Sequence, residues 1–475
     1  MISDLPYDDN DMNSILNYAS LLLDKSLSDV LNDNLKVTYK GKGGFGQKVE
    51  KLYFKYEPNS NPEPDFYKVG IELKTTPLKQ VKKGYVSKER LVFNIIDFEK
   101  EYKETFKTSS FWKKNQLLLL MFYLYEQEKL DVDYLFKIIR LWQFPAKDLK
   151  IIKDDWAKIV LKIKNGKAHE ISEGDTLYLG ACTKGANNTS LRSQPFSTEM
   201  AMQRAFSLKS KYLNFIIEKS LNNEEVLIDY EEYDKILNED NSLSEPKAEY
   251  RRLNLKEIEP IVKSIDEYEE GETFENLVIK KFIPFIGLSV DEIIEKLKIE
   301  KPSAKNFLNI ISKTILGVSK NKIEEFEKAD VLMKTIKLEK SGSLKESMSF
   351  SQIQYKDIIE EEWEDSYWYN TVTKRFFFVV FQKDNNSILR FQKVFFWTMP
   401  PEDIKLAEVF WGDTKNKIIS NEFNNFIKIT HDNICHVRPK AKNNFDLMET
   451  AFGTMEKKKS YWINSSYIKK IIKNQ

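Results

Sequence analysis

Hydrophobic and polar positions follow two different periods along the chain. Residues 14–31 place apolar side chains at helical spacing and predict an amphipathic helix. Residues 66–75 instead alternate apolar and polar positions, which is typical of a half-buried strand. Apolar runs at 117–125 and 375–381 are too short to span a bilayer and predict buried strands. Helix-like and strand-like segments are interleaved, which indicates an α/β fold.

Further segments of the first half fit this fold class. A glycine-rich turn opens a predicted helix within residues 40–56, and residues 153–166 form another predicted helix. Residues 89–97 form a predicted strand, and the strand 175–182 runs into the polar loop 183–195. We therefore expect a mixed central β-sheet flanked by helices.

The same pattern starts again after a polar stretch. Residues 278–297 resemble residues 14–31, and residues 329–340 lie over residues 64–75 without a gap. Three further segments recur in the same order, at 304–318, 372–384 and 436–445. Recurrence in a fixed order predicts a diverged tandem duplication.

The domain boundaries follow from this repeat. We predict two tandem domains, at residues 1–235 and 259–475, each with its own mixed sheet. The polar residues 236–258 are the predicted linker. The alternative is that this stretch is a solvated helix within one domain.

The charge balance excludes a strongly basic chain. The 475 residues carry 74 Lys and Arg against 73 Asp and Glu, so a polyanion must be bound by local clusters. Two cysteines, Cys182 and Cys435, cannot build a disulfide framework or a zinc cage. The N-terminal residues lack a basic segment followed by an apolar run, so we expect a cytoplasmic protein with no membrane partner.

Candidate chemistry gathers on the strand at 66–75. Residues two apart on a strand face the same way, so Glu72 and Lys74 project together, with Asp65 entering from a turn. Two carboxylates in one pocket repel unless a cation neutralises them, and Mg²⁺ prefers such oxygen ligands. The Leu73 carbonyl would lie beside them, and Glu50 on the preceding helix is placed to assist. Whether one or two ions bind is open.

An ordinary charged strand face is the alternative to this metal site. The D-x6-E-x-K spacing occurs by chance in a chain rich in Lys and Glu, where it would be a charged strand face. The segment GKGGFG resembles a phosphate-binding loop, but it lacks the ending GK[ST] and no clear strand precedes it. The spacing alone does not decide between a metal site and a charged surface.

The surrounding segments are more specific. GFGQKVE followed by PEPDFYKVGIELKT resembles the MutH mismatch-repair nicking endonucleases and their longer relatives, the Sau-type restriction enzymes that cut at GATC. The resemblance continues through FWKKNQLLLLMFY and AFSLKSKYLNFII, and it returns in the second copy at HVRPKAKNN and SYWINSSYIKKII. A chain with two copies is similar to the restriction-enzyme branch. The resemblance implies tandem restriction-endonuclease-like domains of the PD-(D/E)xK superfamily.

The resemblance also implies the residues that cut DNA. Its catalytic set is Glu50, Asp65, Glu72 and Lys74, with Lys114 or its neighbour Lys113 as an auxiliary lysine. The implied Mg²⁺ ligands are Asp65, Glu72, Leu73 and Glu50. The implied reaction is hydrolysis of double-stranded DNA on the 5′ side of G in GATC, which leaves 5′-phosphates.

The expected DNA contacts lie in loops of both copies. They are Lys184, Asn187, Asn188, Arg192, Lys209, Arg438, Lys440 and Lys442. Cys182 and Thr183 stand where the family has Arg and Pro, whereas the second copy keeps Arg438 and Pro439. The first copy therefore departs from the family in its recognition loop.

The second copy is predicted to bind DNA without cutting it. The gapless overlay matches Asp330 with Asp65 but puts Lys337 at Glu72 and Glu339 at Lys74. Ser312 falls at the position of Glu50 in the same comparison. Basic residues with interleaved aromatic residues dominate the stretch after Arg438, as expected of a phosphate-binding surface. By resemblance this copy is an effector domain that binds a second site.

These features lead to one principal hypothesis and two alternatives. The principal hypothesis is a Mg²⁺-dependent type II restriction endonuclease of the bacterial cytoplasm, acting as a monomer or a DNA-induced dimer. A host methyltransferase would protect its site. The alternatives are a MutH-like nicking repair enzyme and a non-catalytic DNA-binding regulator.

Overall fold

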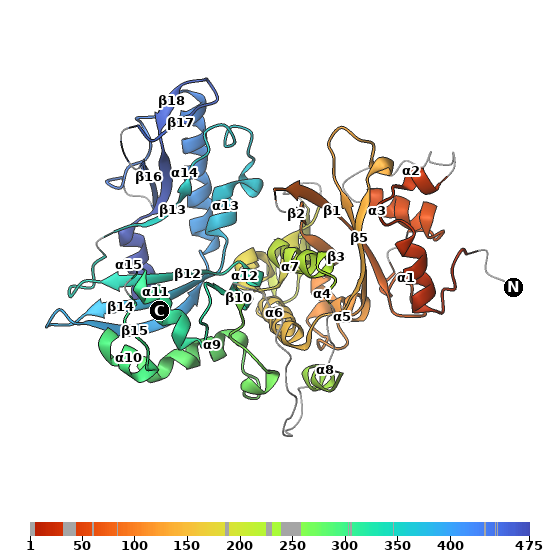
Figure 1. The fold of residues 1–475 in the computed structure, drawn as a ribbon, viewed down its shortest axis with the longest axis horizontal. Coiled ribbons are helices and arrows are strands. Elements are labelled where there is room, and N and C mark those ends of the chain that lie inside the picture. Colours follow the sequence, from red (N-terminus) through yellow and green to blue (C-terminus); the bar gives the residue numbers. More distant parts are fainter. Residues whose placement is uncertain are drawn as a thin grey trace.

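The computed structural model describes the greater part of the chain. The described residues are 5–31, 44–58, 61–82, 84–185, 190–224, 230–238, 258–302, 304, 306–344, 346–431, 434–441, 443 and 445–475. Figure 1 shows two α/β lobes side by side. The described residues up to 238 are called the first half, and those from 258 onward the second half.

The central sheet of the first half has the strand order β2-β1-β4-β5. Its strands are β1 (Glu72–Val81), β2 (Gly84–Ser87), β4 (Leu118–Leu124) and β5 (Phe136–Trp142). Strands β1 and β4 are parallel, and the other two pairs are antiparallel. Every residue of β4 except the last is buried, because both faces of the sheet are covered. The apolar run at 117–125 is thus the predicted buried strand.

Different helices cover the two faces of this sheet. Leu73 and Ile71 share an apolar cluster with α1, α3 and η1, whereas Leu120 packs with α5, α6 and α7. The bounds are α1 (Met12–Ser20), α3 (Gly44–Lys48), η1 (Val49–Tyr53, a π-helix), α5 (Ser110–Asn115), α6 (Ala146–Lys164) and α7 (Ser210–Leu221). Because side chains alternate along a strand, Glu72 and Lys74 project from the side of β1 opposite Leu73.

A smaller sheet completes the first half. It has the order β3-β9-β6, and a separate hairpin joins β7 to β8. The bounds are β3 (Leu91–Ile95), β6 (Leu179–Thr183), β7 (Leu191–Gln194), β8 (Ser197–Met202) and β9 (Arg204–Leu208), with α2 (Leu27–Val30), α4 (Phe98–Glu101) and α8 (Tyr230–Leu237). Strand β6 leads into the stretch that contains Lys184.

The second half repeats this order of elements. Strand β12 pairs in parallel with β14, which pairs antiparallel with β15, as β1, β4 and β5 do. A second sheet has the order β13-β19-β16. The strands are β12 (Leu332–Leu338), β13 (Met348–Gln352), β14 (Phe376–Lys383), β15 (Leu389–Trp397), β16 (Cys435–Pro439) and β19 (Lys459–Ile463), with the short pairs β10 (Ile258–Glu259), β11 (Lys322–Ile323) and β17 (Leu447–Glu449), β18 (Met455–Lys457). The predicted duplication is therefore visible in the topology.

Helices of the second half follow their strands in the same order as helices of the first half. They are α9 (Phe274–Phe282), α10 (Val290–Leu297), α11 (Phe307–Ile315), α12 (Glu324–Ala329), α13 (Tyr367–Val372), α14 (Pro401–Ile419) and α15 (Ser465–Asn474). Helix α14 follows β15 as α6 follows β5, and each begins just after a proline N-cap. Helix α15 follows β19 as α7 follows β9.

Two predicted elements have different bounds in the structure. The predicted helix 14–31 is interrupted, because Leu23 forms a bridge with Phe136 and Ser26 caps a new helix, α2. The predicted strand 66–75 begins only at Glu72, because Phe66 and Ile71 close a tight turn between them. The remaining predicted helices and strands of the first half shift at their ends only, whereas the predicted loop 183–195 contains β7, which pairs with β8. Residues 40–43 and most of the predicted linker lie outside the described residues.

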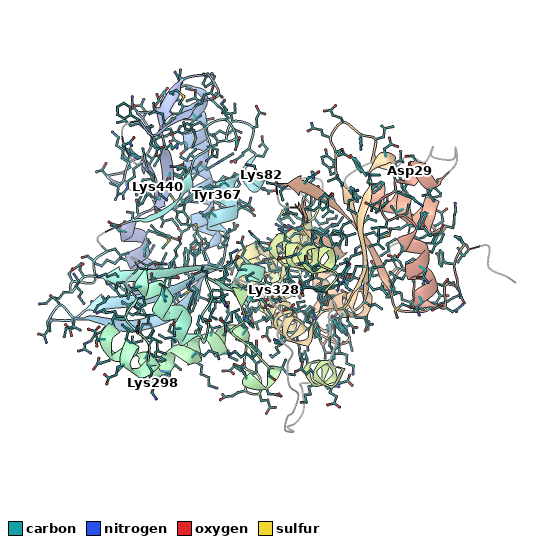
Figure 2. All side chains as sticks on the ribbon, in the orientation of Figure 1. Asp29, Lys82, Lys298, Lys328, Tyr367 and Lys440 are labelled. Atoms are coloured by element: carbon teal, nitrogen blue, oxygen red, sulfur yellow. The ribbon has the colours of Figure 1, made fainter. Side chains whose placement is uncertain are left out.

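The two halves share one apolar cluster. It contains Leu120 and Ile152 of the first half together with Phe326 and Phe377 of the second. Figure 2 shows Lys328 of α12 at the contact between the lobes. Within the described part of the chain, no helix is long and apolar enough to cross a membrane.

Candidate active site

Asp65, Glu72 and Lys74 meet at the start of β1. The Lys74 ammonium donates to Glu72 Oε1 at 2.6 Å. The Asp65 N–H donates to Glu72 Oε2 at 3.1 Å, and the Leu73 N–H donates to Asp65 Oδ2 at 3.0 Å. The Glu72 side chain is only 2% exposed. The turn and the strand thus hold two carboxylates and one ammonium group together.

A tight turn places Asp65 beside the strand. The Phe66 N–H donates to the Ile71 carbonyl at 2.9 Å, and the Ile71 N–H donates back at 3.2 Å. Gly70 lies within this turn at φ +71°, a conformation that residues with a Cβ rarely adopt. The chain therefore reverses between Asp65 and Glu72, which explains why residues seven apart in sequence are neighbours in space.

Glu50 approaches the same cluster from η1. Burial, the nearby Asp65 and, more weakly, Glu72 raise the pKa of Glu50 to about 7, against the opposing effect of Lys74. Helix α3 lies close to β1 because Gly46 has no side chain: a Cβ there would lie 2.9 Å from Thr75 Oγ1. The glycine-rich segment thus serves close packing that brings Glu50 to the strand.

Lys114 supplies a second cation from α5. Its ammonium lies 3.7 Å from Glu72 Oε1 and donates to the Asn61 carbonyl at 2.9 Å. The neighbouring Lys113 is exposed. Of the two candidate lysines, the structure brings Lys114 to the acidic pair.

Tyr56 is a site residue that the sequence did not reveal. Its hydroxyl is buried and has no hydrogen-bond partner within the described residues. Burial and the charges of Asp65, Glu50 and Glu72 raise its pKa. No local pattern marks this tyrosine; its position just after the helix that carries Glu50 is the one available signal.

The donor set suits a hard divalent cation. Asp65, Glu72 and Glu50 offer carboxylate oxygens, and burial raises the pKa of Glu72 despite the opposing charge of Lys74. Burial is the main cause of the raised pKa of Glu50; Asp65 and Glu72 add to it, and Lys74 and Lys114 oppose it. Carboxylate oxygens are the ligands that Mg²⁺ prefers. Among the described residues, however, no three Asp, Glu, His or Cys side chains already converge as a metal cage. In this conformation Lys74 and the Leu73 N–H engage the carboxylates.

The predicted DNA contacts of the first half have different surroundings. Lys184 is exposed just beyond β6, and Arg192 is exposed on β7, where its Nε donates to Gln203 Oε1 at 2.7 Å. Asn187 and Asn188 lie outside the described residues. Lys209 does not fit a DNA contact: it is buried, and its ammonium donates to the Thr176 carbonyl. That prediction was wrong, because the lysine before α7 points inward.

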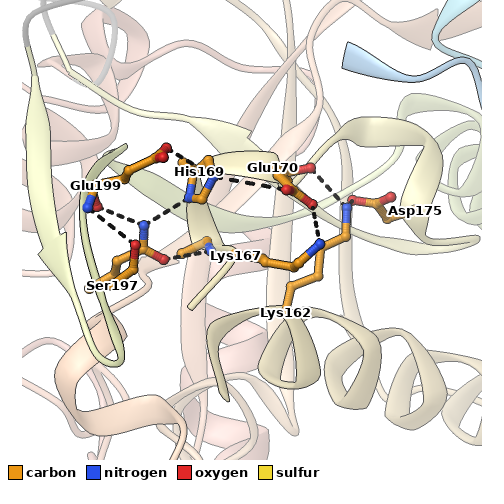
Figure 3. Close-up of polar contacts among 9 residues, drawn as sticks. Lys162, Lys167, His169, Glu170, Asp175, Ser197 and Glu199 are labelled. Atoms are coloured by element: carbon orange, nitrogen blue, oxygen red, sulfur yellow. Dashed lines mark hydrogen bonds and ion pairs between the residues drawn. The ribbon is translucent and has the colours of Figure 1, made fainter. Parts of the chain in front are cut away.

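A polar network anchors the hairpin that carries Arg192. His169 Nε2 lies 3.2 Å from Glu199 Oε2 on β8, and the Gln194 amide lies 2.9 Å from His169 Nδ1 (Figure 3). The Gln194 Oε1 atom also accepts from the Ala168 N–H at 2.7 Å. The turn end of the hairpin is thereby tied to the segment that follows α6.

The second half presents the other predicted contacts. The Arg438 guanidinium lies 3.7 Å from the centre of the Trp462 ring. Lys440 is exposed, and its ammonium donates to the Phe350 carbonyl at 2.6 Å. Lys442 lies outside the described residues.

Strands β1 and β12 begin with equivalent contacts. The Glu72 N–H donates to the Leu117 carbonyl at 3.0 Å, and the Leu332 N–H donates to the Arg375 carbonyl at 2.9 Å. Glu72 pairs with the first residue of β4, and Leu332 pairs with the first residue of β14. In the same register, Lys74 and Lys334 each occupy the third paired position.

The gapless overlay of the two copies was therefore wrong. Strand pairing places Leu332, not Lys337, at the position of Glu72, and Lys334, not Glu339, at the position of Lys74. In the first half a turn precedes the strand, whereas α12 leads almost directly into β12 through Asp330 at φ +54°. Ser312, matched with Glu50, is buried and donates to the Leu308 carbonyl at 2.7 Å. The apolar residue Leu332 thus stands where the first half has the acid Glu72.

Known proteins match both halves of the chain. A family model described as DNA mismatch repair enzyme MutH matches residues 54–155 and 317–408. The type II restriction enzyme Sau3AI of Staphylococcus aureus is 35% identical over 486 aligned residues, which cover 91% of this chain and 93% of that protein.

Two further matches cover a smaller part of the chain. The DNA mismatch repair protein MutH of Shewanella woodyi is 30% identical over 193 residues, which cover 39% of this chain and 79% of that protein. A solved complex of the restriction endonuclease MvaI with cognate DNA aligns at 14% identity with a TM-score of 0.20, covering 46% of this chain and 97% of that one. The match along nearly the whole length of both chains decides the assignment: the chain belongs to the MutH-like type II restriction endonucleases, which are site-specific DNA nucleases.

Proposed function

We propose that the first half hydrolyses double-stranded DNA at GATC with Mg²⁺ and that the second half binds a second site as an allosteric effector. The observation that carries the proposal is the contact of Asp65, Glu72 and Lys74 at the start of β1. The sequence GATC comes from the resemblance to the Sau-type enzymes. The predicted domain boundaries belong to the same proposal.

Asp65 and Glu72 are the residues that would hold Mg²⁺, together with the Leu73 carbonyl and Glu50. When bound, Mg²⁺ supplies charge neutralisation at the scissile phosphate and lowers the pKa of a water molecule. The closeness of Glu50 to Asp65 and Glu72 supports this assignment, because a cation would stabilise the charged forms of the three carboxylates.

The two lysines have separate roles in this proposal. Lys74, which is 19% exposed, would stabilise the charge that develops on the phosphate and orient the attacking water. Lys114 lies farther from the acid, at 3.7 Å, and would assist from α5. Hydrolysis on the 5′ side of G would leave a 5′-phosphate.

The chain would carry one cutting centre, because Leu332 stands where Glu72 stands in the first half. A palindromic site has two scissile bonds related by two-fold symmetry, so cutting both strands favours two chains on the DNA. A DNA-induced dimer is therefore the form that we propose for double-strand cleavage. Arg438 and Lys440 of the second half would bind the second site.

The cellular setting is part of the proposal. We infer that the enzyme acts in the bacterial cytoplasm and that a methyltransferase protects the same site in the host genome. The methyltransferase is a functional partner, and the proposal requires no stable complex with it.

Cleavage of unmethylated plasmid tests the proposed reaction. Fragments that end at GATC are expected with Mg²⁺, and Asp65→Ala should abolish them while leaving DNA binding. Uncut plasmid, or fragments unrelated to GATC, would reject the proposed specificity.

A nicking activity is the second candidate, because the MutH relative is 30% identical over 193 residues, 39% of this chain. It predicts nicked circles rather than linear plasmid.

A non-catalytic DNA-binding regulator is the third candidate. It predicts normal DNA affinity but no Mg²⁺ binding by calorimetry, and the intact group of Asp65, Glu72 and Lys74 argues against it.

A further inference from the structure

The second half keeps one charged member of the site that the first half carries. Lys334 occupies on β12 the register position that Lys74 occupies on β1, opposite Phe378 and Leu120 respectively. In the first half that lysine is neutralised by Glu72 at 2.6 Å. In the second half the corresponding residue is Leu332, which packs against the apolar core.

The surroundings of Lys334 are cationic and aromatic. Its ammonium lies 5.1 Å from the centre of the Phe350 ring. Burial and the charges of Lys440 and Lys374 lower the pKa of Lys334. The Lys374 ammonium is itself paired with Asp330 at 2.8 Å. Lys334 and Lys440 thus both contact Phe350, through its ring and its carbonyl, and neither forms an ion pair with a carboxylate within the described part of the chain.

Space for a ligand lies beside this lysine. A cavity of about 400 Å³ opens along β12, the edge strand of its sheet, and Lys334 lines it. The acids at this cavity are Glu339, which pairs with Lys383 at 3.0 Å, and the exposed Glu346. A half-buried ammonium in such a cavity favours an anion as its partner.

We propose that Lys334, supported by Lys440, binds a backbone phosphate of double-stranded DNA without a metal ion. The inference rests on the proposed DNA-binding role of the second half and assigns its phosphate contact. Leu332 stands where the first half has Glu72, so the Lys334 ammonium lacks the acid that Lys74 contacts and is available to bind an anion directly. The second half would then bind DNA through the strand position that belongs to the proposed cutting centre in the first half.

Duplex DNA binding by the full chain in EDTA tests this assignment. Fluorescence anisotropy with a labelled GATC duplex is expected to show that Lys334→Gln lowers affinity about tenfold, as for loss of one charge-assisted hydrogen bond. The slope of log K against log salt should fall by about 0.9, because one phosphate contact is lost. Lys334→Arg retains the charge and should retain most of the affinity.

Lys337→Gln is the matched control, because it removes the same charge one strand position beyond Ile336, at the same cavity. Unchanged affinity of Lys334→Gln would overturn the phosphate contact and leave the DNA-binding role of the second half intact. Equal losses in Lys334→Gln and Lys337→Gln would also overturn it, because they would reflect net charge alone. Absence of any EDTA-resistant binding by the wild-type chain would overturn the metal-free contact together with the effector role.

Discussion

Lys328 of the second half and Asp148 of the first form a buried ion pair across the contact between the lobes. The Lys328 ammonium lies 2.8 Å from Asp148 Oδ1, and the two side chains are 6% and 5% exposed. Burial would lower the pKa of Lys328, but Asp148 and Glu324 outweigh it and raise that pKa above its usual value. The Tyr212 hydroxyl donates to Asp148 Oδ2 at 2.9 Å. The pair therefore belongs to a satisfied polar network inside a shared apolar cluster.

Lys328→Ala should destabilise the whole chain by roughly 3–5 kcal/mol, because it leaves the buried Asp148 and the half-buried Glu324 without their cation. Urea unfolding followed by circular dichroism measures this change. Lys301→Ala is the matched control, since its pair with Asp291 is exposed and should contribute little. Two separate unfolding transitions in the wild type would contradict the shared core.

Glu72→Gln should lower the rate of DNA cleavage by more than about a hundredfold, because the amide removes a negatively charged ligand from the proposed cation site. Duplex binding should persist in the variant. The exposed Glu63 lies just before the turn, so Glu63→Gln provides a control of equal charge change. Comparable losses in both variants would show that the cleavage rate depends on charge near the turn and not on the buried acid.

Lys74→Ala should reduce cleavage more than Lys114→Ala does, because Lys74 contacts Glu72 at 2.6 Å whereas Lys114 lies at 3.7 Å. We expect losses of about a thousandfold and about tenfold, respectively. The exposed Lys113 offers a neighbouring control, and Lys113→Ala should cut normally. Single-turnover cleavage measures the three rates, and a reversed order would contradict the assignment.

Stability should fall as pH rises from about 4.5 to about 7 because of Glu325. Burial and Glu324 raise the Glu325 pKa from 4.5 to about 7 in the folded chain, although the Ile261 and Val262 N–H groups donate to it. Between those pH values the folded state binds more protons than the unfolded state, so stability decreases with pH and levels off above pH 7. Glu325→Gln should flatten this slope, as measured by urea unfolding across pH. The exposed Glu327 on the same helix is the control, and Glu327→Gln should leave the slope unchanged.

The core of the proposed site could be predicted from local pattern. Glu72 and Lys74 share a strand face whatever the tertiary fold, and the Asp65 turn is marked by Gly70. The register of the second copy could not be predicted in this way. Short alternating strands match one another at several offsets, and only the pairing with β14 shows that Leu332 begins β12.

Two further features needed the structure because they depend on distant contacts. Lys209 looks like a surface cation in the sequence, but the Thr176 carbonyl binds it inside the fold. The predicted helix 14–31 has continuous helical periodicity, yet Leu23 pairs with Phe136, far along the chain, and breaks it. Tertiary pairing outweighed local periodicity at that point.

Cleavage of a duplex with a single GATC, beside a duplex with one base of that site changed, tests the central claim most directly. With Mg²⁺ the wild-type chain should cut the first duplex on the 5′ side of G and leave 5′-phosphates, and it should leave the second intact. Glu72→Gln should bind the first duplex without cutting it. Equal cutting of both duplexes, or full activity of Glu72→Gln, would contradict the assignment of β1 as the GATC-cutting centre.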